Sequence, residues 1–142
     1  MMKGVDLGNW LVLEKWMSPE LFDGTSAEDE VHLWRELSET AARERFKVHR
    51  DSWVRERDFV YLAANGIELI RIPVPFFIFG DVAPYVGCIE YLDEAFEWAQ
   101  RHGQKIRARH PALDIIATRC LPLVVFRYEG ECEPPCRRRP VP

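Results

Sequence analysis

GVDLGNWLVLEKWMSPELF, residues Gly4 to Phe22, begins with two short apolar runs, Gly4–Leu7 and Trp10–Leu13, and we expect both to form strands. The pair Ser18-Pro19 follows them. A Ser at the N-cap with a Pro at the first helical position is typical of a helix start. This stretch therefore predicts a change from strand to helix at the beginning of the chain.

Three further helices are predicted before the next strand. Ser26 is expected to cap the first of them, and three acidic residues fall in its first turn, where the helix dipole favours negative charge: Glu28, Asp29 and Glu30. Another helix is expected from Thr40 to about His49. Ser52 can cap a third, which stops at Asn65-Gly66, a pair suited to a left-handed helix end.

The run Ile67–Val74 is apolar almost throughout, which favours a parallel strand covered on both faces. Its Arg71 must meet a carboxylate or an open cleft, because a buried unpaired guanidinium is costly. An ordinary buried ion pair and a role beside a catalytic carboxylate are equally compatible with this position. The steps of three and four from Ile89 to Ala99 predict a helix that ends at Gly103, so strands alternate with helices and a parallel sheet follows.

The composition changes close to Gly103. Up to that residue the chain has 11 Lys and Arg against 19 Asp and Glu, and beyond it 8 against 4. The next strand is due at about Lys105, but KIRARH places Arg107 and Arg109 where apolar residues are expected. LPLVVFRY, Leu121–Tyr128, is the other candidate, and the rest has loop composition. We divide the chain into residues 1–106 and a tail of irregular structure, residues 107–142.

Length and composition limit the possible classes of protein. A chain of 142 residues is normally one domain. It contains no run of about 18 apolar residues and no signal-peptide pattern, so we expect no membrane partner and, for the chain as written, a cytoplasmic location. The cluster Arg137–Arg139 is a weak nucleic-acid signal in an otherwise acidic chain, and no nucleic-acid partner is expected.

Few residues suggest chemistry by themselves. Glu14 ends an apolar run and Trp16 follows it, a pair suited to a sugar because the acid binds hydroxyls and the indole covers the ring face; a solvent-facing Glu is the plainer interpretation. The four histidines show no ligand spacing and are expected at the surface. Cys132 and Cys136 lack a second ligand pair, so incidental thiols are favoured over zinc, and no metal or cofactor is expected.

Three ordered blocks carry a family resemblance: GVDLGNWLVLEKWMSPELFDGT, HRDSWVRERDFVYLAANGIELIRIPVPFFIFGD and PYVGCIEYLDEAFEWAQRHGQKI. Through them, residues 3 to about 106 resemble the N-terminal part of glycoside hydrolase family 5, the cellulase family, in its exo-1,3-β-glucanase and β-glucosidase-like branch. The family fold is a (β/α)8 TIM barrel of about 250 residues. The resemblance thus implies an α/β fold with the first two to three βα units of such a barrel, and with them unpaired strand edges and an apolar inner face.

The resemblance also implies roles for matched positions. Glu14 would hold hydroxyls of the terminal glucose of a β-linked glucan or oligosaccharide, with Trp16 and Phe77 as aromatic neighbours. Arg71 would support the nucleophilic carboxylate. Family members hydrolyse O-glycosyl bonds by a retaining mechanism with two glutamates on later strands, so no catalytic residue is expected here and the chain is expected to be truncated and inactive.

Two rival functions stay open: a non-catalytic β-glucan-binding remnant and an interaction protein that acts through its basic tail.

A separate hypothesis concerns the tail itself. Codons for Arg107–His110, read one base later, permit Val-Leu-Asp-Ile, which is close to the family's third strand. Residues from about 107 onward are then an out-of-frame reading of a disrupted gene. Sequencing the gene beyond the codon of Gln104 tests this, because the missing family segments should appear in another frame.

Overall fold

The structure is a computed structural model and describes residues 1–110, 113–117 and 126–127. Five strands form one sheet in the order β1-β2-β3-β4-β5. The strands and helices have the following bounds: β1 (Gly4–Asp6), a 3₁₀ helix (Pro19–Phe22), α1 (Glu30–Glu36), α2 (Glu39–Trp53), α3 (Glu56–Ala64), β2 (Leu69–Pro73), α4 (Ile89–Arg101), β3 (Lys105–His110), β4 (Leu113–Ala117) and β5 (Phe126–Arg127).

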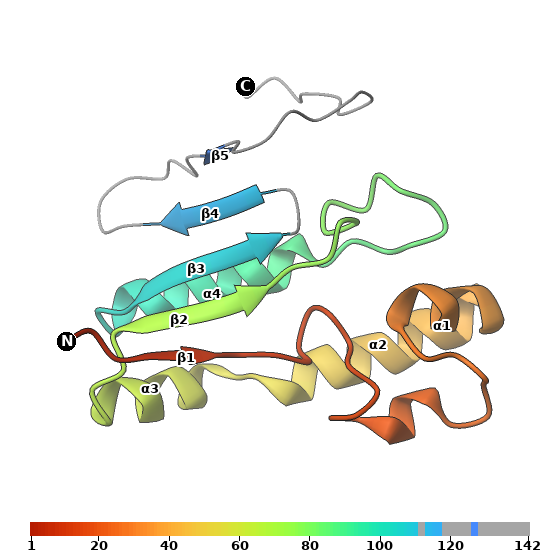
Figure 1. The fold of residues 1–142 in the computed structure, drawn as a ribbon, viewed down its shortest axis with the longest axis horizontal. Coiled ribbons are helices and arrows are strands. Elements are labelled where there is room, and N and C mark those ends of the chain that lie inside the picture. Colours follow the sequence, from red (N-terminus) through yellow and green to blue (C-terminus); the bar gives the residue numbers. More distant parts are fainter. Residues whose placement is uncertain (111–112, 118–125, 128–142) are drawn as a thin grey trace.

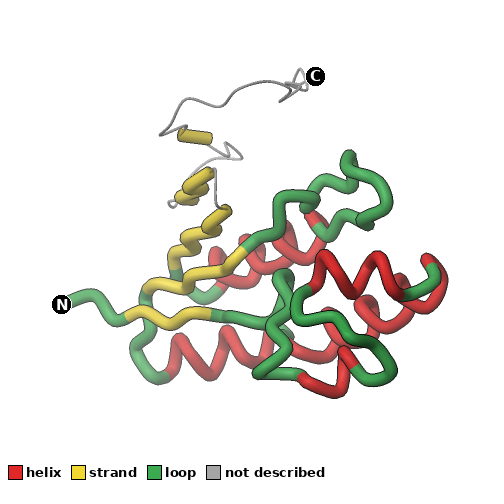
Figure 2. The backbone as a smooth tube through the Cα atoms, turned by 45° about the vertical axis from the view of Figure 1, so that its right-hand side comes forward, coloured by secondary structure: helices red, strands yellow, loops and turns green. Residues whose placement is uncertain are grey.

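The first three strands are parallel, as the alternation of strands and helices predicted. Helices α3 and α4 lie together on one face of these strands (Figures 1 and 2). Apolar side chains on that face form the main core, in which Ile70 and Ile72 of β2 meet Ile106 of β3 and Leu92 of α4. The expected βα arrangement is therefore present over the described residues, as an open sheet rather than a closed barrel.

The other face of the sheet is charged, and the expectation of an apolar inner face is wrong. Burial alternates along β2, so that strand is not covered on both faces. In β3, Ile106 and Ala108 are buried whereas Lys105, Arg107 and Arg109 are exposed. KIRARH forms a strand because its alternate small and apolar residues face the helices and its basic residues face outward.

A second core lies beneath the loops rather than beneath the sheet. Trp34 of α1 and Phe46 of α2 pack edge to face, with 4.8 Å between ring centroids. Phe77 and Tyr85, from the loop after β2, stack on each other in the same cluster. Helices α1 and α2 are thus joined to the loops at one end of the sheet.

Several local predictions need correction. Trp10–Leu13 is not a strand: Trp10 and Leu11 are fully buried in an irregular segment, so their apolar character reflects the core. Asp29, not Ser26, caps α1, because its side chain accepts the His32 N–H at 2.9 Å.

Ser52 does not cap a helix either. It lies inside α2, and its hydroxyl donates to the Val48 carbonyl one turn earlier, at 2.8 Å. By contrast, the stop at Asn65-Gly66 is confirmed, with Gly66 at φ 75°. The helix from Ile89 is confirmed as well.

The described part of the tail departs from the expectation of irregular structure. β4 and β5 are antiparallel to their neighbours, so an irregular tail is wrong for those residues. Only two residues separate β3 from β4, and so short a connection permits an antiparallel pair but no parallel crossover. Of Leu121–Tyr128 only β5 is described. The three tail cysteines and Arg137–Arg139 lie outside the described residues, and the division at residue 106 stays a prediction.

Candidate functional site

The loop from Leu7 to Ser18 positions the carboxylate predicted to bind sugar. It leaves β1 at Leu7, whose N–H donates to the Arg71 carbonyl at 2.8 Å. Asn9 then turns the chain with a left-handed backbone, φ 59°. The N–H groups of Met17 and Ser18 donate to the Glu14 carbonyl at 3.0 and 3.1 Å, which closes a tight turn around Glu14. Since parallel strands carry their sites at their carboxyl ends, this loop lies where a sugar site is expected.

Glu14 and Trp16 are in direct contact. The Trp16 Nε1–H donates to Glu14 Oε2 at 2.8 Å, and Trp16 is 78% exposed. The other carboxylate oxygen lies over Gly8, where an added Cβ would be only 3.0 Å away. The predicted sugar-binding pair is therefore brought together, with an exposed indole face and a carboxylate held by that indole.

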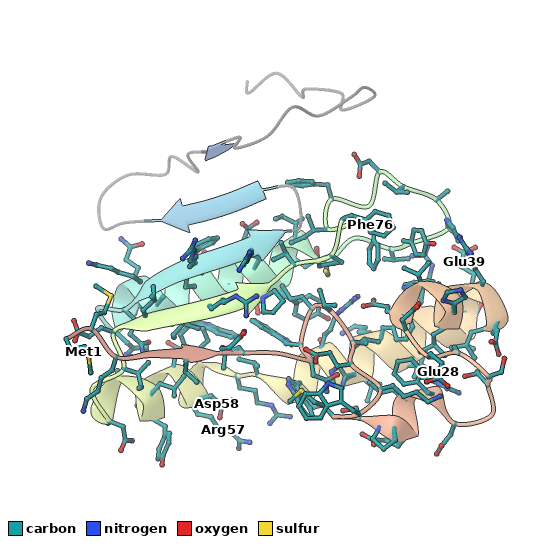
Figure 3. The ribbon with its side chains drawn as sticks, viewed as in Figure 1. Met1, Glu28, Glu39, Arg57, Asp58 and Phe76 are labelled. Atoms are coloured by element: carbon teal, nitrogen blue, oxygen red, sulfur yellow. The ribbon has the colours of Figure 1, made fainter. Side chains whose placement is uncertain are left out.

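An open pocket of about 530 Å³ surrounds this pair. Leu13, Lys15 and Glu28 complete its lining, and Lys15 Nζ donates to a Glu28 oxygen at 2.7 Å. Figure 3 shows Glu28 ahead of α1 and Phe76 after β2, both beyond the carboxyl ends of the parallel strands. The pocket thus combines hydrogen-bonding groups of both charges with an aromatic surface, which suits a polyhydroxylated ligand.

Arg71 meets the carboxylate that its position required. Its guanidinium pairs with Asp6 of β1, its neighbour in the parallel register. Arg107 of β3 is its neighbour on the other side, so a row of charged side chains crosses the outward face of the sheet. The Arg71 Nε is shielded from solvent and has no hydrogen-bond partner among the described residues. The Arg71 side chain is nevertheless 42% exposed on this face of the sheet.

Phe77 does not line the pocket. Its ring is 1% exposed and stacks on Tyr85 with 4.8 Å between centroids. Its neighbours Phe76 and Phe79 are about half exposed instead. The sequence could not distinguish among these three rings because the loop after β2 has no regular periodicity.

The sequence analysis did not identify a buried ion pair that lies beneath the loop. Arg50 of α2 donates to Glu30 of α1 at 2.8 Å and to the Leu11 carbonyl at 3.3 Å. The second Glu30 oxygen accepts the Leu13 N–H at 2.9 Å. Burial raises the pKa of Glu30, and the Arg50 charge works against that rise. Both side chains hold the backbone that leads into Glu14.

His49 is also buried, so the expectation that all four histidines lie at the surface is wrong. Its Nε2 lies 2.5 Å from the Asn9 carbonyl and donates to it. Burial lowers the pKa of His49, which favours the neutral ring. No local signal identified this residue, because its partner lies 40 positions away.

Within the part of the chain that the structure describes, no group of three or more His, Cys, Asp or Glu side chains could hold a metal, and no helix is long and apolar enough to cross a bilayer.

Sequence comparison finds relatives that are named glucan 1,3-beta-glucosidase. A glucan 1,3-beta-glucosidase from Pichia angusta is 40% identical over 110 residues, covering 72% of this chain and 25% of the relative. A probable glucan 1,3-beta-glucosidase A from Aspergillus terreus is 43% identical over 113 residues, covering 75% and 27%. The chain thus spans about a quarter of the length of the curated relatives it matches. No family model matches it.

Comparison with solved structures agrees. The crystal structure of rutinosidase from Aspergillus niger superposes with a TM-score of 0.69 at 25% identity, over 79% of this chain and 33% of that chain. A second structure, titled AoRut, gives 0.61 at 27% identity, over 74% and 31%. The described fold is therefore shared with about a third of these larger proteins.

Proposed function

We propose that this chain carries the sugar-holding half of a β-glucosidase site without the residues that cleave the glycosidic bond. Its similarity to part of the glucan 1,3-beta-glucosidases, and its resemblance to glycoside hydrolase family 5, support this proposal. The ligand is a β-linked glucan or oligosaccharide. Glu14 accepts hydroxyl hydrogen bonds from a terminal glucose, and Trp16 covers a ring face.

The Glu14–Trp16 contact is the observation that carries this proposal. The indole N–H occupies one carboxylate oxygen and fixes the plane of the group. The remaining oxygen is available to a hydroxyl, and hydrogen bonds to a charged acceptor contribute about 1.5–3 kcal/mol each. A fixed carboxylate beside an exposed aromatic ring gives both polar and stacking recognition of a sugar.

The sheet is proposed to be one arc of a (β/α)8 barrel. Three parallel strands with helices on a single face are the arrangement that such an arc requires. The outward row of Asp6, Arg71 and Arg107 would then face the barrel interior, where Arg71 would lie close to a nucleophilic carboxylate from a later strand. Superposition on about a third of a rutinosidase supports this arrangement.

Hydrolysis by this chain alone is not expected. A retaining glycosidase needs two carboxyl groups about 5 Å apart, one as acid/base and one as nucleophile. The family's acid/base follows an Asn in an Asn-Glu-Pro segment, and the 142 residues contain no such segment. Incubation with laminaribiose should therefore release no glucose above a buffer blank; enzymatic release would refute this part of the proposal.

Binding is tested with laminaritriose, titrated into the purified chain and followed by NMR. A half-site without its opposite wall is expected to bind in the millimolar range, which is about 4 kcal/mol. Glu14→Gln should weaken binding about tenfold or more, because it removes the charged acceptor. Trp16→Ala should weaken it severalfold by removing the stacking surface.

Matched controls separate these effects from general destabilisation. Glu44→Gln alters an exposed carboxylate on α2, and Tyr61→Ala removes an exposed ring on α3, both away from the pocket. Both should bind laminaritriose like the wild type. A folded chain that shows no binding at tens of millimolar sugar, or equal losses in site and control variants, would contradict the proposal.

A further inference from the structure

Asn9 occupies an unusual place in the loop that carries Glu14. Its backbone has φ 59°, in the left-handed region, which Asn visits more readily than most residues other than Gly. The residue is fully buried. Its carbonyl accepts the His49 Nε2–H of α2 at 2.5 Å. A helix 40 residues away therefore fixes the point at which the loop reverses.

The Asn9 side chain then spans the loop. Its Oδ1 accepts the Glu14 N–H at 2.7 Å, and its Nδ2 donates to the Ser18 hydroxyl at 2.7 Å. Ser18 is itself fully buried, at the start of the 3₁₀ helix. One amide thus holds the residue that carries the carboxylate and the residue that closes the loop.

The carboxylate has little other support. Glu14 Oε2 is held by Trp16, whose ring is largely exposed, and Oε1 lies over Gly8. Gly8 is tied in turn to α2, because the Trp53 indole N–H donates to its carbonyl at 3.1 Å. The backbone of Glu14 is held more firmly: its carbonyl accepts the Met17 and Ser18 N–H groups, and its N–H donates to the side chain of the fully buried Asn9.

We propose that Asn9 is the positioning residue of the Glu14 carboxylate: its side-chain amide sets the backbone of Glu14 so that the carboxylate lies over Gly8 with one oxygen free for a sugar hydroxyl. The inference rests on the proposed function for the identity of the ligand. Asn9 itself touches no sugar. Both hydrogen bonds of its side-chain amide lie within the loop, and its contribution to binding passes through Glu14.

The decisive variant is Asn9→Gly, because Gly accepts the left-handed backbone while losing both side-chain hydrogen bonds. Asn65→Gly is the matched control, since it removes another side-chain amide at the end of α3, away from the loop. Two measurements are made on the whole chain. One is laminaritriose affinity, and the other is the NMR signal of the Trp16 indole N–H, identified by its loss in Trp16→Phe.

In the wild type, Glu14→Gln should shift the Trp16 indole signal, because that N–H donates to the carboxylate. When Glu14→Gln is added to Asn9→Gly, the Trp16 indole signal should stay nearly unchanged. Asn9→Gly alone should lower the laminaritriose affinity about tenfold or more. Asn65→Gly should keep both wild-type behaviours. Far-UV circular dichroism and the other four indole signals check that the variants are folded.

An Asn9→Gly chain that keeps its laminaritriose affinity and its response to Glu14→Gln would overturn the positioning role. If Asn9→Gly fails to fold, Ser18→Ala decides, because it removes only the acceptor of Nδ2; a Trp16 signal that stays at its wild-type position would refute the inference. If the wild type binds no sugar, the proposed function fails while the indole signal still decides the role of Asn9.

Discussion

Replacing Arg50 by Met should destabilise this protein far more than an average substitution. The Arg50 and Glu30 side chains are only 4% and 5% exposed, and Arg50 Nη2 lies 2.8 Å from Glu30 Oε1. Arg50→Met leaves that oxygen and the Leu11 carbonyl without their donor. Removing one partner of a buried ion pair costs about 3–5 kcal/mol, because a charge is left buried and unpaired.

Urea unfolding followed by tryptophan fluorescence measures the effect, since Trp10 and Trp34 are buried beside the pair. With a urea dependence of about 2 kcal/mol per molar, the midpoint should fall by about 2 M. The double variant Glu30→Leu with Arg50→Met should recover much of the loss, because no charge is then buried. Arg50→Lys, which keeps the charge, should lose less than Arg50→Met and provides a measurable midpoint if the latter is unfolded.

The loss should also depend on pH. Burial raises the pKa of Glu30 and the Arg50 charge opposes that rise, so Glu30 in Arg50→Met should stay protonated to higher pH. A carboxyl whose folded pKa is raised stabilises the fold below its unfolded pKa and loses that effect as pH rises through the folded value. The deficit of Arg50→Met should therefore be smaller at pH 5 than at pH 8. A midpoint within about 0.5 M of wild type, or a double variant no more stable than the singles, would refute this reasoning.

Two further predictions concern buried titratable groups. Burial lowers the pKa of His49 in the folded protein. The contribution of the neutral His49 to stability should therefore be complete above its unfolded pKa of about 6.5 and should decline as pH falls through that value. The urea midpoint of His49→Gln should change less between pH 7.5 and pH 5.5 than the midpoint of the wild type. Burial raises the pKa of Cys88 to about 12. In a variant whose other cysteines are changed to Ser, the Cys88 thiol should therefore react with a disulfide reagent at pH 8 only after the protein is unfolded in urea. Reaction of native Cys88 at the rate of the unfolded chain, or equal pH responses of His49→Gln and wild type, would contradict these two expectations.

The elements that the sequence predicted well carry their signals locally. In α4 the apolar steps and the stop at Gly103 lie within fifteen residues, and the helix was found there. β2 was likewise placed from a short apolar run, although its two-sided burial was not borne out. Local periodicity cannot report which face of a strand a partner will cover, because the covering helices are distant in sequence.

The candidate site was only partly predictable for the same reason. Glu14 and Trp16 are two residues apart, and their meeting required no long-range knowledge. The buried contacts beneath this pair could not be predicted from nearby residues. Arg50 pairs with Glu30, 20 positions away, and His49 donates to the Asn9 carbonyl, 40 positions away. Trp10–Leu13 was misassigned as a strand because apolar character indicates burial, and Trp10 is buried here against Tyr91 and Trp98 of helix α4.

The pairing of β1 with β2 has a consequence for how this protein folds. Asp6 and Arg71 are 65 positions apart, and α1, α2 and α3 all lie between them. Closing so long a loop is entropically unfavourable until the enclosed helices have shortened it, so contacts of high sequence separation form slowly. β1, with three residues, should join after β2, α4 and β3 have assembled. Mutations in β1 should then accelerate unfolding while leaving the refolding rate nearly unchanged.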